Sequence, residues 1–186
     1  MILAVVVHTA AAFLFIIEVM PTQTMNKTNL SEIKALILDM DGVLWRDNAP
    51  IGDLATIFKT IMSRYQVILA TNNSTNSAAM YVEKLARFGV QLEDWRIVNS
   101  SQATAAYLKE RFPKGGNIYI VGEKGLHQEL TTAGFQHAEA DVLAVVVGMD
   151  REINYAKLTL AAIFIQQGAL YIGTNPDRTF PTSQGL

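Results

Sequence analysis

The stretch that decides the fold is "KALILDMDGVLW", residues 34–45. An apolar run ends in two acidic residues, Asp39 and Asp41, and Gly42 follows them. In an extended strand, residues i and i+2 point to the same side, so both carboxylates can face one way while Met40 packs the other way. Two carboxylates this close repel each other unless a cation lies between them, and Mg²⁺ suits such an oxygen pair. The stretch therefore predicts a strand that ends in a metal site.

The rest of the chain alternates between apolar runs and helical patterns. We expect strands at 35–38, 67–70, 96–98, 118–121, 142–147 and 169–173, and helices at about 53–64, 76–88, 101–112, 124–133 and 154–167. Gly89, Gly134 and Gly168 fall where helices should end. The strands are apolar throughout rather than alternating, which predicts an α/β fold with a parallel sheet covered on both faces.

A second group of polar residues follows the second expected strand. In sheets of this kind, ligands bind beyond the carboxyl ends of the strands. The run at 67–70 leads into Thr71, Asn72 and Asn73, and either Ser74 or Thr75 is expected to cap the next helix. Hydroxyl and amide groups beside a helix N-terminus with free N–H groups bind anions. A phosphoryl group bound to Mg²⁺ would satisfy both groups of residues.

Composition excludes several other classes of protein. The 186 residues carry a formal net charge of −2 with no basic stripe, so we expect no nucleic-acid partner. The absence of cysteine excludes disulfides and thiolate metal sites.

The first 20 residues are apolar apart from three positions and are long enough to span a bilayer. Residues 1–24 are therefore either a membrane anchor or an extension outside the working protein, and we favour the extension. A membrane partner is expected only if the anchor is real. Even then, Lys27 and Lys34 would keep the following domain cytoplasmic.

Three stretches together carry a resemblance to a known family. "DMDGVLW" at 39–45, "ILATNNST" at 68–75 and "GTNPDRTFPT" at 173–182 resemble the haloacid dehalogenase (HAD) superfamily. More narrowly, they resemble its NagD-like, 4-nitrophenylphosphatase-like branch (subfamily IIA), which includes phosphoglycolate and pyridoxal phosphate phosphatases. The resemblance covers about residues 33–186. It implies an incomplete HAD-like Rossmannoid core at 25–102 and an inserted α/β cap domain of the C2 type at 103–186.

The resemblance also assigns roles to the polar residues. Asp39 would be the nucleophile that becomes an aspartyl phosphate, and Asp41 the general acid and then the general base. Mg²⁺ would be held by the side chain of Asp39 and the backbone carbonyl of Asp41. Thr71, Asn72 and Asn73 would bind the phosphoryl oxygens of the substrate.

The implied activity is Mg²⁺-dependent hydrolysis of a small-molecule phosphate monoester in the cytoplasm. Asn175 and Asp177 would lie on a cap loop that faces the phosphate. The family also places a lysine and a GDxxxTD-type motif after the cap, whereas here no lysine follows Lys157 and no acidic residue follows Asp177. We therefore expect this chain to be the N-terminal part of a longer enzyme and to be inactive alone. The sequence indicates neither the particular phosphate ester nor the oligomeric state. A homo-oligomer formed through the cap is one alternative.

Two other functions compete with the phosphatase. One is a phosphate-binding or regulatory module that keeps the fold without turnover. The other is a receiver-like signalling domain, which is disfavoured because its phosphoacceptor lies on a later strand than its acidic pair. Plainer structural roles also remain: Asp39 and Asp41 could form a turn or a helix cap, and the residues 71–73 and 175–177 could be turns alone.

Overall fold

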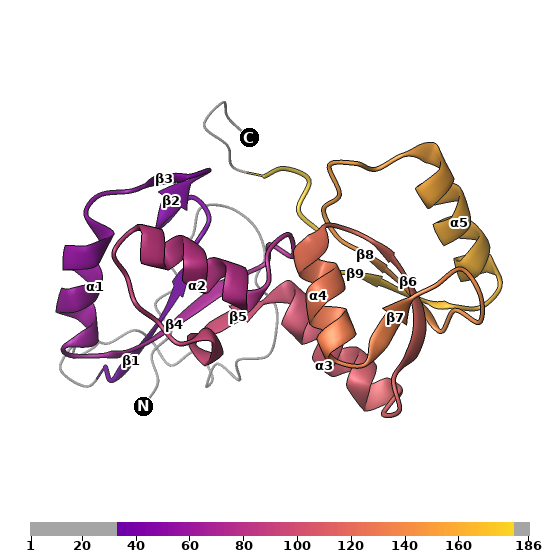
Figure 1. The fold of residues 1–186 in the computed structure, drawn as a ribbon, viewed down its shortest axis with the longest axis horizontal. Coiled ribbons are helices and arrows are strands. Elements are labelled where there is room, and N and C mark those ends of the chain that lie inside the picture. Colours follow the sequence, from indigo (N-terminus) through magenta and orange to yellow (C-terminus); the bar gives the residue numbers. More distant parts are fainter. Residues whose placement is uncertain (1–32, 181–186) are drawn as a thin grey trace, which may run out of the picture. The chain divides into compact units, whose positions relative to one another are not determined.

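The computed structural model describes residues 33–180, which Figure 1 shows as a ribbon. The described residues divide into two compact units, one of residues 33–69 and 177–180 and the other of residues 70–176. Within the described residues, no helix combines the length and the apolar character needed to cross a membrane. Residues 1–32 lie outside the described part, so both interpretations of the leader stay predictions.

The first unit begins with the strand that the opening stretch predicted. Its elements are β1 (Ala35–Asp39), β2 (Trp45–Arg46), β3 (Ala49–Pro50), α1 (Leu54–Met62) and most of β4 (Gln66–Thr71). Strands β2 and β3 form an antiparallel hairpin. Helix α1 begins at an N-cap, Asp53, whose carboxylate accepts the N–H of Thr56 at 3.1 Å. The helix then buries Leu54 and Phe58 on one face.

Strand β4 is the middle strand of a three-stranded sheet with the order β1-β4-β5. All five residues of β1 are half-buried. Strand β1 is an outer strand of this sheet in the described part of the chain.

The second unit continues with α2 (Ala78–Arg87), the 3₁₀ helix η2 (Asp94–Arg96), β5 (Ile97–Asn99) and α3 (Ser100–Arg111). Helix α3 begins with a reciprocal capping box. The Asn99 side chain accepts the N–H of Gln102, and the Gln102 side chain accepts the N–H of Asn99. The box joins β5 directly to α3 without an intervening loop.

A four-stranded parallel sheet with the order β7-β6-β8-β9 forms the rest of this unit. The elements are β6 (Gly116–Val121), α4 (Lys124–Thr132), β7 (Phe135–His137), β8 (Ala144–Val147), α5 (Tyr155–Gln166) and β9 (Leu170–Gly173). One apolar cluster joins this sheet to α3 and α4, and a second cluster joins it to α5. This sheet is therefore parallel and covered on both faces, as the sequence predicted.

Each expected strand and helix overlaps an observed element, and the three glycines expected at helix ends all have positive φ. The sequence did not predict the hairpin or β7, which are short. The proposed domain limits, 25–102 and 103–186, stay a prediction.

Candidate functional site

The carboxylate pair lies at the end of β1. Asp39 is the last residue of the strand, and Asp41 follows one residue later. Between them, Met40 has no exposed surface, whereas both aspartates are half-buried. The predicted alternation is thus present: the apolar side chain packs inward and the two carboxylates remain accessible.

A tight turn follows the pair and orients one of its members. The N–H of Leu44 donates to the carbonyl of Met40, and the N–H of Gly42 donates to the carbonyl of Trp45, each at 2.8 Å. Gly42 adopts a φ of 80°, which favours glycine. The turn brings the indole Nε1 of Trp45 to 2.8 Å from Oδ1 of Asp41, to which it donates. Trp45 is only 1% exposed, so a rigid donor fixes the orientation of the Asp41 carboxylate.

The donor atoms of this pair fit Mg²⁺ better than a metal that needs a closed cage. Among residues 33–180 there is no cluster of three or more His, Cys, Asp or Glu side chains that could hold a metal ion. Mg²⁺ commonly uses one or two protein carboxylates and completes its coordination with water and phosphate oxygens. Asp39 and Asp41 supply what such a site requires.

The stretch after β4 is a turn built by its own side chains. Oγ1 of Thr71 accepts the N–H of Asn73 at 3.1 Å, and Oδ1 of Asn73 accepts the N–H of Thr75 at 2.9 Å. The hydroxyl of Ser100, at the start of α3, donates to the carbonyl of Asn72 at 2.7 Å. The three residues 71–73 therefore lie in a defined conformation, with Thr71 and Asn73 buried and Asn72 half-buried.

The expected cap of the next helix was wrong. Ser77, not Ser74 or Thr75, is the N-cap of α2, and its hydroxyl accepts the N–H of Met80 at 3.4 Å. The physical reason is the turn at Asn73, whose side chain already engages Thr75 and delays the start of the helix.

The N-terminus of α2 also differs from the expectation of free N–H groups. The N–H of Ala78, the first residue of the helix, donates to Oε1 of Glu129 at 2.9 Å. Beside it, the hydroxyl of Ser77 donates to Oε1 of Gln128 at 3.2 Å. A carboxylate from α4 therefore occupies part of the position that sequence reasoning gave to a phosphate. Nothing in the sequence indicated this contact, because the partners are 51 residues apart.

The same turn lies against the carboxyl ends of the four-stranded sheet. Oγ1 of Thr174, just after β9, donates to Oγ of Ser74 at 3.1 Å. A Cβ at Gly148, just after β8, would lie 2.5 Å from Oγ of Ser74, so a larger residue there would force the Ser74 side chain to shift. The N–H of Gly125 donates to the carbonyl of Thr75 at 3.0 Å. The second unit thus holds the turn from several sides.

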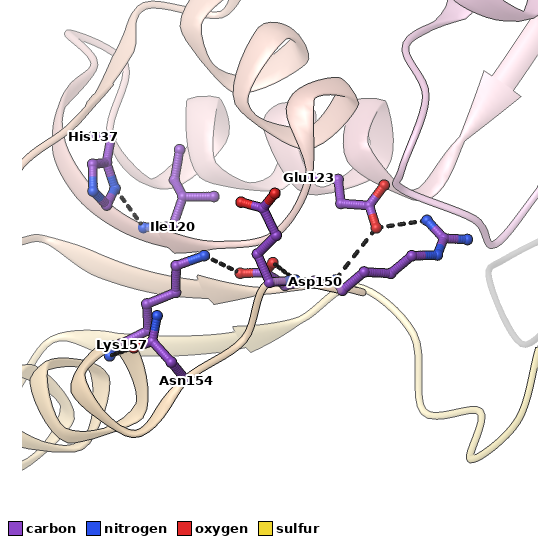
Figure 2. A network of polar contacts seen from close by, with 8 residues as sticks. Ile120, Glu123, His137, Asp150, Asn154 and Lys157 are labelled. Carbon is purple, nitrogen blue, oxygen red and sulfur yellow. Dashed lines mark hydrogen bonds and ion pairs between the residues drawn. The ribbon is translucent and has the colours of Figure 1, made fainter.

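A separate group of charged side chains ties β8 to α5 (Figure 2). Nζ of Lys157 donates to Oδ2 of Asp150 at 2.7 Å, and the Asp150 side chain is only 3% exposed. This hydrogen bond is the main cause that raises the pKa of Lys157. Nη1 of Arg151 lies 2.6 Å from Oε1 of Glu123. These pairs join strand ends to a helix and explain the positions of the charges without a ligand.

Two predictions about the site stay predictions. Asp39 and Asp41 belong to the first unit and residues 71–73 to the second, and their mutual approach is not described. Asn175 and Asp177 are both half-buried but fall in different units, so their role toward phosphate also stays untested.

The chain is similar to one hydrolase family and to several phosphatases. The profile of a family described as haloacid dehalogenase-like hydrolase matches residues 36–136. The acid sugar phosphatase of Staphylococcus aureus is 33% identical over 160 residues, which cover 84% of this chain and 61% of that protein. The chloroplastic phosphoglycolate phosphatase 1A of Arabidopsis thaliana is 32% identical over 184 residues, covering 85% of this chain and 51% of that protein.

Solved structures agree with these relatives. The 4-nitrophenylphosphatase of Thermotoga maritima matches with a TM-score of 0.76 and 30% identity, over 83% of this chain and 59% of that one. The glycerol phosphate phosphatase of Mycobacterium tuberculosis, solved in complex with magnesium, matches with a TM-score of 0.73 and 30% identity, over 82% of this chain and 46% of that one. The chain thus spans about half to three fifths of the length of the curated relatives it matches.

Proposed function

The chain belongs to the haloacid dehalogenase-like hydrolases, and on that premise we propose that it hydrolyses a small-molecule phosphate monoester with Mg²⁺ as cofactor. The observation that carries the proposal is the end of β1. There, two half-buried carboxylates flank a fully buried Met40, and the indole of Trp45 fixes the Asp41 carboxylate. The phosphatase relatives support the reaction class.

The two aspartates divide the chemistry between them. A carboxylate oxygen of Asp39 attacks phosphorus, and the bond between phosphorus and the leaving oxygen breaks while Asp41 donates a proton to that oxygen. Asp41 then takes a proton from a water molecule that attacks the aspartyl phosphate, which releases inorganic phosphate and restores Asp39. The hydrogen bond from Trp45 keeps the Asp41 carboxylate in one orientation through both steps.

Binding of the phosphoryl group falls to the turn after β4. Thr71, Asn72 and Asn73 would direct donors at its oxygens, and the internal hydrogen bonds of the turn reduce the reorganisation needed on binding. Mg²⁺, held by the Asp39 side chain and the Asp41 carbonyl, would offset the charge between carboxylate and phosphate. Asn175 and Asp177, on a loop of the C2-type cap at 103–186, would face the same group.

The substrate is proposed only as a class, because the relatives are named for several different small phosphate esters. We propose a cytoplasmic place of action; if residues 1–20 are a membrane anchor, Lys27 and Lys34 on its C-terminal side would keep the domain in that compartment.

A second candidate is a module that binds phosphate without turnover. It would use the same turn at residues 71–73, whose internal hydrogen bonds do not depend on a covalent step at Asp39.

One experiment separates the two candidates. The 186-residue chain is compared with a fusion that adds the part of the Staphylococcus aureus acid sugar phosphatase beyond its matched region. Hydrolysis of p-nitrophenyl phosphate and binding of inorganic phosphate are measured with Mg²⁺ and with EDTA. We expect Mg²⁺-dependent hydrolysis by the fusion and far less by the chain alone. A folded fusion that binds phosphate but releases none from the ester would favour the binding module.

A further inference from the structure

Helix α4 makes three contacts with the segment that runs from the turn after β4 to the start of α2. Gly125, Gln128 and Glu129 have the spacing i, i+3 and i+4, which places them on one face of the helix. On that face, Glu129 accepts a hydrogen bond from the N–H of Ala78, and Gln128 accepts one from the hydroxyl of Ser77.

The third contact shows how closely the two segments approach. The N–H of Gly125 donates to the carbonyl of Thr75 at 3.0 Å. A Cβ at Gly125 would lie 2.3 to 2.5 Å from backbone atoms of Asn76, so the helix and the turn touch through their backbones. The turn is therefore shaped by α4 as well as by its own hydrogen bonds.

We propose that Glu129 is a positioning residue for phosphate binding, because its carboxylate holds the start of α2 and so fixes the turn that carries Asn72 and Asn73. This inference rests on the proposed function, which gives those two residues to the phosphoryl group. Glu129 itself touches no substrate.

The charge of Glu129 adds a second consequence. The N-terminus of a helix carries a partial positive charge that attracts anions. Because the Glu129 carboxylate already accepts the first N–H of α2, phosphate does not bind that N–H. Phosphate is then directed to the side-chain donors of residues 71–73 and not to the end of the helix.

The test uses the 186-residue chain and inorganic phosphate with Mg²⁺ as the probe. Amide chemical shifts of Asn72 and Asn73 report the dissociation constant, and hydrogen exchange of the Ala78 amide reports the contact. Glu129→Ala removes the acceptor, Glu129→Gln keeps an oxygen at the same place, and Glu110→Ala on the exposed side of α3 is the matched control.

We expect Glu129→Ala to weaken phosphate binding about tenfold and to speed Ala78 exchange by a similar factor, as for the loss of a hydrogen bond to a charged group. Glu110→Ala should stay within about twofold of the parent, since it leaves the acceptor of Ala78 in place. Glu129→Gln should lose less than Glu129→Ala, since a neutral amide oxygen still accepts the N–H but less strongly than a carboxylate. The proposal is overturned if Glu129→Ala binds phosphate like the parent, or if Glu129→Gln is as weak as Glu129→Ala.

Two further outcomes remain informative. If Glu129→Ala does not fold, Glu129→Asp takes its place, because the shorter side chain keeps the charge but cannot reach the amide as well. If the parent shows no phosphate response at Asn72 and Asn73, the assignment of these two residues to the phosphoryl group fails. Ala78 exchange then decides the positioning role alone: faster exchange in Glu129→Ala with rescue by Glu129→Gln supports it, and unchanged exchange overturns it.

Discussion

At the scale of single residues, the end of β1 is organised by the buried indole of Trp45, which donates a hydrogen bond to the Asp41 carboxylate. Asp39 and Asp41 were predicted because they end an apolar run two residues apart, and Met40 between them is fully buried as that pattern requires. The hydrogen bond from Trp45 was not predictable, because it depends on a turn whose closure is set by a short hairpin. The sequence indicated which residues are candidates for the chemistry, but not that Trp45 contacts one of them.

Trp45 provides a prediction at this scale. Trp45→Phe keeps a ring in the buried site but removes the Nε1 hydrogen bond to the Asp41 carboxylate. We expect turnover to fall by about tenfold, the worth of a hydrogen bond to a charged group. The fall should be larger for an alkyl phosphate than for p-nitrophenyl phosphate, because the alkoxide leaving group needs its proton more.

The measurement is turnover of both esters by the fusion protein described above. Trp95→Phe is the matched control, since Trp95 is 61% exposed and lies outside the site. Equal losses for the two esters would show that the Trp45 indole serves packing alone.

At the scale of elements, long periodic segments were predicted and short ones were not. Helix α5 and strand β6 were expected from their apolar patterns. Strands of two or three residues, such as β2 and β7, contain too few positions for any period to show. The N-cap of α2 was misplaced because the Asn73 side chain competes with the helix for the backbone of Thr75.

Gly125 tests how closely α4 packs on the turn after β4. Gly125→Ala forces a Cβ against the backbone of Asn76, which cannot yield as a side chain would. We expect the free energy of unfolding to fall by about 1–3 kcal/mol, the usual range for overpacking. Denaturant titration measures this loss. Gly173→Ala is the control, because its Cβ would meet nothing nearer than 3.5 Å; an equal loss there would contradict the packing argument.

Two histidines of the second unit make its stability depend on pH. The N–H of Ile120 donates to Nδ1 of His137 at 3.0 Å, which requires that nitrogen to be unprotonated (Figure 2). Desolvation lowers the pKa of His137 and of His127 below the ordinary value of 6.5. The unfolded chain therefore binds these protons more readily than the folded one. Stability should be complete above about pH 6.5 and should decrease as the pH falls below it.

Thermal unfolding between pH 8 and pH 5 checks this expectation. His137→Phe removes the titrating group while an aromatic ring remains beside Tyr119, whose ring centroid lies 5.0 Å from that of His137. The variant should lose part of the acid sensitivity. A melting temperature that falls equally with pH in the parent and in a variant lacking both His127 and His137 would assign the effect to other groups.

At the scale of the whole molecule, the family was predictable and the internal contacts were not. Three short motifs in order indicated a HAD-like α/β protein, and the matched family and the parallel sheet confirm it. The contact between Glu129 and the start of α2 joins residues far apart in the chain, so no local pattern contains it. The domain limits and the approach of the carboxylates to the turn at 71–73 stay predictions.

The central claim is that Asp39 carries the phosphoryl group, and one substitution tests it most directly. Mg²⁺-dependent hydrolysis of p-nitrophenyl phosphate is measured for the fusion protein, for its Asp39→Asn variant and for Asp47→Asn as control. Asp47 has a φ of 50°, which asparagine also tolerates, so the control makes the same chemical change in the nearby hairpin. We expect hydrolysis by the parent and by Asp47→Asn and none by Asp39→Asn, because an amide cannot form the acyl phosphate. Turnover by folded Asp39→Asn within about tenfold of the parent would contradict the account.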